Sequence, residues 1–271
     1  MSAGRPTSVG RALVRACHPE PSGAVTVAVV LLALHWGASA GTAVLVGVAA
    51  LTGQLSVGWS NDYLDRERDR ISGRRDKPLA TGALGVGTVR VAIVAAALVT
   101  VAASLCLGVR AGALHLALVA MAWGYNLGLK STILSWMPYA VCFGGLPAVV
   151  SLAVRDDAGP PWLVVAGVLL GTGAHLVNAV PDLEDDRRTG VHGLPHRLGA
   201  RGSVDLATAL LLAGTVVTAV VPADGLDLVA VVALSACAVL LVVGRVAPGR
   251  GPFLAAVGIA LVNVVSVVVR T

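Results

Sequence analysis

Acidic residues gather in two short segments, and the first has a spacing that suits metal and phosphate binding. It carries Asn61, Asp62, Asp65 and Asp69. Asn61, Asp65 and Asp69 recur at every fourth position, so on a helix they share one face. Gln54, about two helical turns earlier, extends that face toward the apolar sequence before it. The segment predicts a helix that ends in a stripe of oxygen ligands.

The second segment repeats this pattern. His175, Asn178, Asp182 and Asp186 follow one another at helical spacing, and the first two lie within an apolar run. Polar groups at membrane depth are costly, face the protein interior or a wet cavity, and usually mark function. The two stripes could therefore face one cavity.

Carboxylates held this close repel one another unless a cation neutralises them. Mg²⁺ prefers oxygen ligands and keeps phosphate oxygens in its coordination shell. Nearby basic side chains, which include Arg70, Arg75, Lys77 and Lys130, could donate to phosphate oxygens as well. A salt-bridged rim of helix ends would explain one such cluster equally well. Two clusters of the same design favour a diphosphate site.

The composition indicates that a membrane surrounds these segments. Of 271 residues, 56% are hydrophobic and only 13% are charged, whereas soluble domains carry about 25% charged residues. The basic residues lie in short loops between apolar runs and not on one soluble face, which excludes a nucleic-acid partner. The chain is expected to be a multi-pass integral membrane protein in contact with lipid.

Apolar runs near the length of a membrane-spanning helix, roughly 20 residues, predict an all-α bundle of nine transmembrane helices. Residues 1–23 form a polar N-terminal segment, and residues 24–271 form a single membrane-embedded domain. The expected spans are 24–39, 42–60, 87–109, 111–129, 133–154, 161–181, 204–222, 226–244 and 252–269.

The distribution of basic residues orients this bundle. Cytoplasmic loops carry an excess of Lys and Arg. With nine spans and the N-terminus inside, all but three of the 20 Lys and Arg residues face the cytoplasm, the exceptions being Arg110, Arg155 and Arg270. Both acidic segments fall on the same side. The sequence predicts a protein of the cell membrane whose site opens toward the cytoplasm.

The motifs Asn61-Asp62-x-x-Asp65-x-x-x-Asp69 and Asp182-x-x-x-Asp186 resemble the two aspartate-rich motifs of the UbiA superfamily of intramembrane prenyltransferases. That family also has nine transmembrane helices with both motifs on cytoplasmic loops. The resemblance implies that these five aspartates bind Mg²⁺ and an isoprenyl diphosphate, and that Asn61 and Asn178 orient or ligate beside them. Loss of diphosphate would give an allylic carbocation, which an acceptor captures.

Two further segments are similar to parts of that family. Gly124 to Lys130 resembles its Tyr- and Lys-containing region, which implies that Lys130 contacts diphosphate; a lysine reaching from a helix end toward water is the alternative. The family places its Lys four residues after the Tyr, but here Lys130 follows Tyr125 by five, which leaves the role of Tyr125 open. The loop from 75 to 82 resembles the family's basic loop and implicates Arg70, Arg75 or Lys77 in diphosphate binding or loop closure.

His175 and Gln54 are candidates for orienting the acceptor or for receiving the proton that it loses. A buried histidine that makes one interhelical hydrogen bond is the competing interpretation. Tyr139 and Phe143 are among the aromatic residues that could stabilise a cation through their ring faces, although helix packing explains them as well.

The sequence thus predicts an enzyme that transfers an isoprenyl chain from its diphosphate to an aromatic or lipid-like acceptor with Mg²⁺. The expected catalytic residues are Asp62, Asp65, Lys130, Asp182 and Asp186. Two alternatives stay open. A UbiA-type terpene cyclase would use the diphosphate alone, and a transporter would place its acids near the bilayer midplane, usually at broken helices.

Overall fold

The structure is a computed structural model that describes residues 8–222 and 226–270, and its regular elements there are helices. Three are short 3₁₀ turns, η1 (Leu129–Ser131), η2 (Ile133–Trp136) and η3 (Val180–Asp182). The others are α1 (Val9–Ala16), α2 (Pro19–His35), α3 (Ala40–Ile71), α4 (Val86–Cys106), α5 (Val109–Leu127), α6 (Met137–Arg155), α7 (Pro161–Ala179), α8 (Leu183–Arg188), α9 (Leu194–Val220), α10 (Leu228–Val246) and α11 (Gly251–Arg270).

Seven stretches of this bundle are long and apolar enough to cross a membrane: α3, α4, η2 with α6, α7 through α8, α9, α10 and α11. The helices α1 and α2 meet at 71° and add an eighth span if they are taken together. α5 is not among these candidates, and its sequence includes Arg110 and His115. The all-helical integral membrane fold is confirmed. The nine-span count and the cytoplasmic N-terminus stay predictions, although each predicted run falls on a separate helix.

The N-terminal part of the chain is more structured than its polar sequence suggests. α2 begins at Pro19, within the segment expected to end at residue 23, because proline is favoured at the first position of a helix. α1 packs on α3, where the indole nitrogen of Trp59 donates to the Leu13 carbonyl at 2.9 Å. The first seven residues of the predicted N-terminal segment lie outside the described residues.

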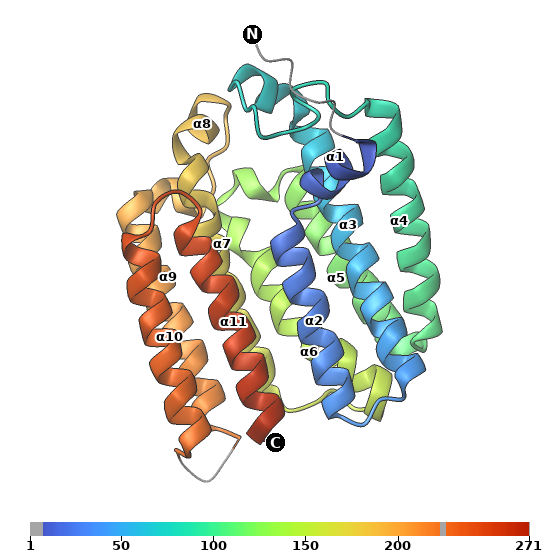
Figure 1. Ribbon diagram of the computed structural model, residues 1–271, viewed down its shortest axis with the longest axis vertical. Coiled ribbons are helices and arrows are strands. Elements are labelled where there is room, and N and C mark those ends of the chain that lie inside the picture. The colour runs from blue at the N-terminus through green and yellow to red at the C-terminus, as the bar shows by residue number, and fades with distance from the viewer. Residues whose placement is uncertain (1–7, 223–225, 271) are drawn as a thin grey trace.

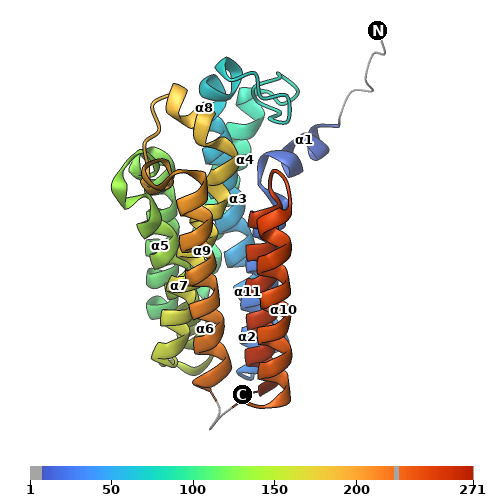
Figure 2. The same ribbon diagram turned by 90° about the vertical axis from the view of Figure 1, so that its left-hand side faces the viewer.

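The long helices run side by side, and the short elements gather at one end (Figure 1). α1, the loop from 72 to 85, and α8 all lie at the end where α3 and α7 finish. α2 and α11 are far apart in the sequence but contact each other, as both views show (Figure 2). This arrangement brings the two acidic segments to the same end of the bundle.

Small residues allow the central helices to approach closely. A methyl group on Gly167 of α7 would overlap the carbonyl oxygen of Phe143 on α6. A Cβ on Gly171, one turn later, would lie 2.6 Å from the Cβ of Phe143. Glycine at such contacts is typical of helices packed in lipid, where van der Waals contact replaces much of the hydrophobic driving force. The glycines of α7 therefore fix the position of α6 and its aromatic side chains.

Candidate active site

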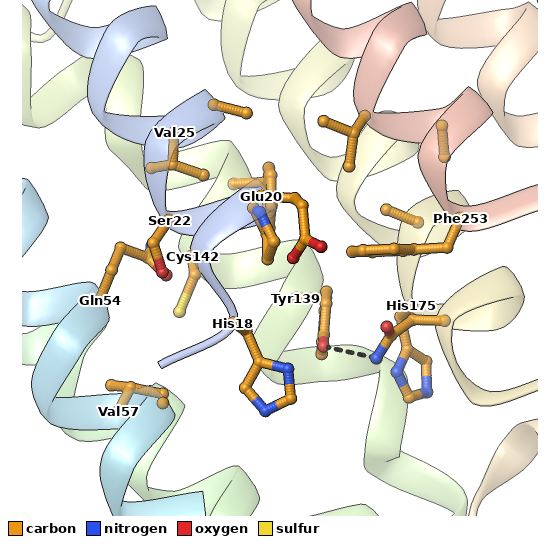
Figure 3. Close-up of a pocket in the computed structure, with 18 of the residues that line it drawn as sticks. His18, Glu20, Ser22, Val25, Gln54, Val57, Tyr139, Cys142, His175 and Phe253 are labelled. Carbon is orange, nitrogen blue, oxygen red and sulfur yellow. Dashed lines mark hydrogen bonds between the residues drawn. The ribbon is translucent and has the colours of Figure 1, made fainter. Parts of the chain in front are cut away.

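A cavity of about 690 Å³ lies among the helices. Figure 3 shows side chains from α2, α3, α6, α7 and α11 facing the same space, including Gln54, Tyr139, His175 and Phe253. The charged lining residues belong to the end that carries α1 and α8, whereas apolar side chains of α2, α7 and α11 line the rest. Such a cavity suits a molecule with an ionic head and an apolar body.

Both predicted polar stripes line this cavity. Gln54, Asn61, Asp65 and Asp69 of α3 contribute to it. So do His175 and Asn178 of α7, together with Asp182 and Asp186 in the short helices that follow. The helical spacing of each stripe turns its polar groups to one side, and the bundle places the two sides opposite one space.

Asp62 takes a different position from the other acids. Its side chain is only 1% exposed, and one carboxylate oxygen accepts a hydrogen bond from Nζ of Lys77 at 2.6 Å. His18 Nε2 lies 3.4 Å from the same oxygen and 3.3 Å from the lysine nitrogen. The other oxygen, Oδ2, is buried without a hydrogen-bond partner among the described residues. Since buried polar atoms normally have a partner, this oxygen is available to a further ligand.

Asp65 is paired with the predicted Lys130. Nζ of Lys130 lies 2.6 Å from both carboxylate oxygens, and a guanidinium nitrogen of Arg68 lies 3.1 Å from one of them. Asn61 donates to Asp65 at 3.2 Å and to the side-chain oxygen of Asn126 at 3.1 Å. Lys130 is buried, so it is not a lysine extended into solvent. The contacts hold Asp65 at a fixed position in the cavity wall.

The second acidic group is tied to the loop that follows the first. Arg74 donates to Asp182 at 2.7 Å and holds both carboxylate oxygens of Asp76 at 2.9 and 2.8 Å. The hydrogen bond from Arg74 lowers the pKa of Asp76 to about 2, and the same contact raises the pKa of Arg74. Both groups are therefore charged at neutral pH. Asp186 lies 3.3 Å from Nε2 of His196, which lies in the first helical turn of α9.

Aromatic rings lie on the route from these acids into the apolar part of the cavity. The ring centroids of Tyr139 and His175 are 4.9 Å apart, and Tyr125 meets both edge to face at 5.5 and 5.8 Å. The amide nitrogen of Asn178 donates to the Tyr139 hydroxyl at 3.4 Å, the dashed line of Figure 3. Phe143 lies parallel to Tyr139, one turn further along α6. His175 also contacts the Ser135 hydroxyl at 3.1 Å.

Two predicted basic residues lie apart from this group. Arg70 is exposed and forms a two-point contact with Glu67. Arg75 is exposed, and neither residue lines the cavity. Arg74, which lies between them in the sequence, faces the site instead. The order of basic residues in the loop carries no signal that would select it.

Sequence reasoning also missed His18 and Asn126. His18 reaches Asp62 because it forms the bend between α1 and α2, where its backbone is left-handed with a φ of 54°. No periodic pattern marks that bend. Asn126 follows the predicted Tyr125, and it donates to the carbonyl of Val57 and the hydroxyl of Ser60, which joins α5 to α3. Its position in a mostly apolar helix was the available signal.

The donor chemistry of the site fits Mg²⁺ together with a phosphate-bearing ligand. Within residues 8–222 and 226–270, no three His, Cys, Asp or Glu side chains are close enough to hold a metal by themselves. Asp65, Asp69, Asp182 and Asp186 nevertheless offer hard oxygen ligands to one cavity, and Oδ2 of Asp62, outside the cavity lining, lacks a partner among the described residues. Mg²⁺ is commonly bound by one or two carboxylates plus substrate phosphates rather than by a complete protein cage. Asp62, Asp65, Asp69, Asp182 and Asp186 are the residues that could hold it.

Two curated proteins are similar in sequence to parts of this chain. A "Lycopene elongase/hydratase" of Haloferax volcanii is 38% identical over 105 residues, which cover 38% of this chain and 33% of that protein. The "Bacteriochlorophyll synthase 33 kDa chain" of Cereibacter sphaeroides is 31% identical over 181 residues, which cover 62% of this chain and 59% of the relative. The matches thus span about a third and about three fifths of these curated relatives.

Solved structures share the fold along nearly the whole chain. The apo structure of a UbiA homologue from Aeropyrum pernix K1 matches with a TM-score of 0.74 at 18% identity, covering 97% of this chain and 98% of that one. A UbiA homologue from Archaeoglobus fulgidus, solved with GPP and Mg²⁺, matches with a TM-score of 0.70 at 16% identity, covering 95% and 99%. The family model of the UbiA prenyltransferases matches residues 22–250, so the chain belongs to the UbiA prenyltransferase family.

Proposed function

We propose that this protein transfers an isoprenyl chain from a prenyl diphosphate to an acceptor within the membrane, with Mg²⁺ as its cofactor. The observation that carries the proposal is a single cavity that joins two acidic groups at one end to an apolar interior. A prenyl diphosphate has the same division into an ionic head and a hydrocarbon tail. The complex of the Archaeoglobus homologue with GPP and Mg²⁺ supports this assignment.

The cations of the site provide the means of binding the diphosphate. Lys77, Lys130 and Arg74 each contact one acid of the two motifs and line the cavity. The carboxylates would hold Mg²⁺, which would supply neutralisation of the charge that develops on the leaving diphosphate. The three cations can then donate to diphosphate oxygens, which are strong acceptors for charged donors. Cleavage of the carbon–oxygen bond leaves the electron pair on diphosphate and an allylic cation on the chain.

The aromatic residues are placed to receive that cation. Tyr139 lines the cavity and is linked through Asn178 to the helix that leads into the second motif. A cation near an aromatic ring is stabilised by the ring's electron density, and the stabilisation is larger in a desolvated site. An acceptor nucleophile attacks the cation from the same cavity and then loses a proton. His175 and Gln54 line the cavity and are the candidates for orienting the acceptor or accepting that proton.

We also propose that the site lies on the cytoplasmic side of the cell membrane, because most basic residues lie at the end of the bundle that carries the acids. The acceptor is drawn from the classes suggested by the relatives, an isoprenoid hydrocarbon or a tetrapyrrole, or from aromatic and lipid-like molecules.

The test uses purified protein in detergent with labelled prenyl diphosphates, each with and without a panel of acceptors from these classes. Diphosphate release that needs Mg²⁺ and yields a prenylated acceptor is the expected result, and EDTA should abolish it. An Asp62→Asn/Asp182→Asn variant should be inactive. Glu67→Gln is the matched control, since Glu67 lies in the first acidic segment but faces solvent with Arg70.

Other outcomes would assign a different function. Cyclic hydrocarbon formed without an acceptor would identify a terpene cyclase. If wild type and the double variant are equally inert with every diphosphate, the transferase proposal fails.

A further inference from the structure

Three helices define how far the cavity extends from the acids. Its lining on α2 runs from Pro19 to Leu32, and on α11 from Phe253 to Val267. On α7 it runs from Ala179 back to Leu163. At 1.5 Å per residue, these stretches are about 20 to 24 Å long. Because the lining stretches of three separate helices have similar lengths, they indicate a deep channel parallel to the bundle axis.

Apart from Gln54, about 10 Å along α3 from Asn61, this channel offers few polar side chains below its entrance. Between its ends, the lining stretch of α11 contains Asn263 as a strongly polar side chain, and α9 adds Thr218. These two side chains hydrogen-bond to each other, and Asn263 also donates to Thr215 and to the Ile259 carbonyl. Because their donors and acceptors are satisfied within the protein, they need no polar ligand. A hydrocarbon can occupy the channel without leaving these groups unpaired.

Buried apolar side chains close the far end. Leu32, Leu163 and Val267 are 7%, 9% and 3% exposed. Leu163 and Val267 also line a second cavity of about 600 Å³, whose other lining residues include Trp36, Trp162 and Arg155. The two residues thus form a partition between an apolar channel and a separate space at the other end of the bundle.

The depth of the channel can be compared with the length of a prenyl chain. One isoprenoid unit adds four carbons to the main chain and extends about 5 Å at ordinary carbon–carbon bond lengths. We infer that the channel holds a donor tail of about four isoprenoid units, the geranylgeranyl class, with its end at the partition of Leu32, Leu163 and Val267. This inference rests on the proposed function, because it places the diphosphate at the acidic end.

Residues halfway down the channel provide the test. Ala28 and Ala260 line it, about 12 Å along α2 from Glu20 and about 10 Å along α11 from Phe253. A phenyl ring at either position would block the channel and leave room for a tail of about two isoprenoid units. Val27 is adjacent to Ala28 but 50% exposed, so Val27→Phe adds the same ring outside the channel.

Binding of dimethylallyl, geranyl, farnesyl and geranylgeranyl thiolodiphosphates, which resist ionisation, is measured with Mg²⁺ on wild type and the three variants. Ala28→Phe and Ala260→Phe should each raise Kd for the two longer analogues by about tenfold, while Kd for dimethylallyl changes little. Val27→Phe should match wild type for all four. Thermal unfolding of each variant identifies any that fails to fold. One folded variant, Ala28→Phe or Ala260→Phe, is enough to test the inference.

The outcomes separate this inference from the function it rests on. If a folded Ala28→Phe or Ala260→Phe variant raises Kd for all four analogues equally, or for none, the tail does not occupy this channel. The inference is then wrong, while the transferase proposal stands. If wild type binds no analogue even with Mg²⁺, the proposed function itself is wrong.

Discussion

Each acid of the first motif has its own environment, and the differences decide what substitution does. Asp62 is buried against Lys77, whereas Asp65 lies in the cavity wall against Lys130. Removing one partner of a buried pair leaves an uncompensated charge, which is more destabilising than removing both. The two motif aspartates are therefore expected to respond differently to loss of their cations.

Lys77→Met should lower the free energy of unfolding by about 3 kcal/mol, because the charge of Asp62 then lacks its main partner. Adding Asp62→Asn should restore most of that stability but no activity. Thermal unfolding in detergent and prenyl transfer on the same preparations measure the two effects. Equal stability of Lys77→Met and wild type would show that His18 alone compensates Asp62.

The ring of Tyr139 is expected to matter more than its hydroxyl. Tyr139→Phe removes only the hydrogen bond from Asn178 and should keep kcat within a few-fold of wild type. Tyr139→Leu removes the ring and should lower kcat about tenfold, corresponding to about 1.4 kcal/mol of transition-state stabilisation. KM for the donor should stay similar in both. Equal losses of kcat in the two variants would contradict a role for the ring face.

At the scale of elements, the loop from 72 to 85 connects the two acidic groups through Arg74. Arg74→Gln removes the charged contacts with Asp76 and Asp182, so the loop loses its tie to the second motif. KM for the donor should rise about tenfold, with a smaller change in unfolding temperature. Arg75→Gln is the control, since Arg75 is exposed and lies outside the cavity. A larger effect of the control would support the initial assignment of Arg75 instead.

Helical periodicity predicted much of the site because each stripe is local. The spacing of Gln54, Asn61, Asp65 and Asp69 depends only on α3, and all four line the cavity. The choice of Arg74 over its neighbours depends on how a loop folds against a distant helix. Contacts of that kind, like the reach of His18 across the α1–α2 bend to Asp62, leave no periodic signal in the sequence.

The fold was predictable for a similar reason and to a similar limit. Apolar runs of membrane length mark helices directly, since the backbone in lipid must satisfy its own hydrogen bonds. The same rule does not reveal that α1 folds back onto α3, because the packing of α1 depends on its own Ala12 and Ala16 and on Trp59 of α3. Eight residues with two arginines do not form a membrane span, so tertiary contacts decide their place.

At the scale of the whole molecule, the predicted orientation can be tested by labelling. Arg75 and Asp156, both exposed, lie in loops after α3 and α6 and can each be changed to Cys. In a background with Cys106 and Cys142, the native thiols that are not buried, changed to Ser, a membrane-impermeant maleimide should label Asp156→Cys on intact cells. Arg75→Cys should react only after permeabilisation. The reverse pattern would place the acidic end outside the cytoplasm.

The pairing of motif acids with lysine and arginine has a consequence for how ligands assemble. Asp62, Asp65 and Asp182 each have a cationic partner within the chain. A metal that binds Asp65 or Asp182 would compete with these cations, whereas Oδ2 of Asp62 has no partner among the described residues. A diphosphate that binds the cations would draw them from the carboxylates. Each ligand thus removes the other's competitor. Their coupling free energy is favourable and reciprocal, so the metal and the diphosphate should each bind weakly alone and tightly together.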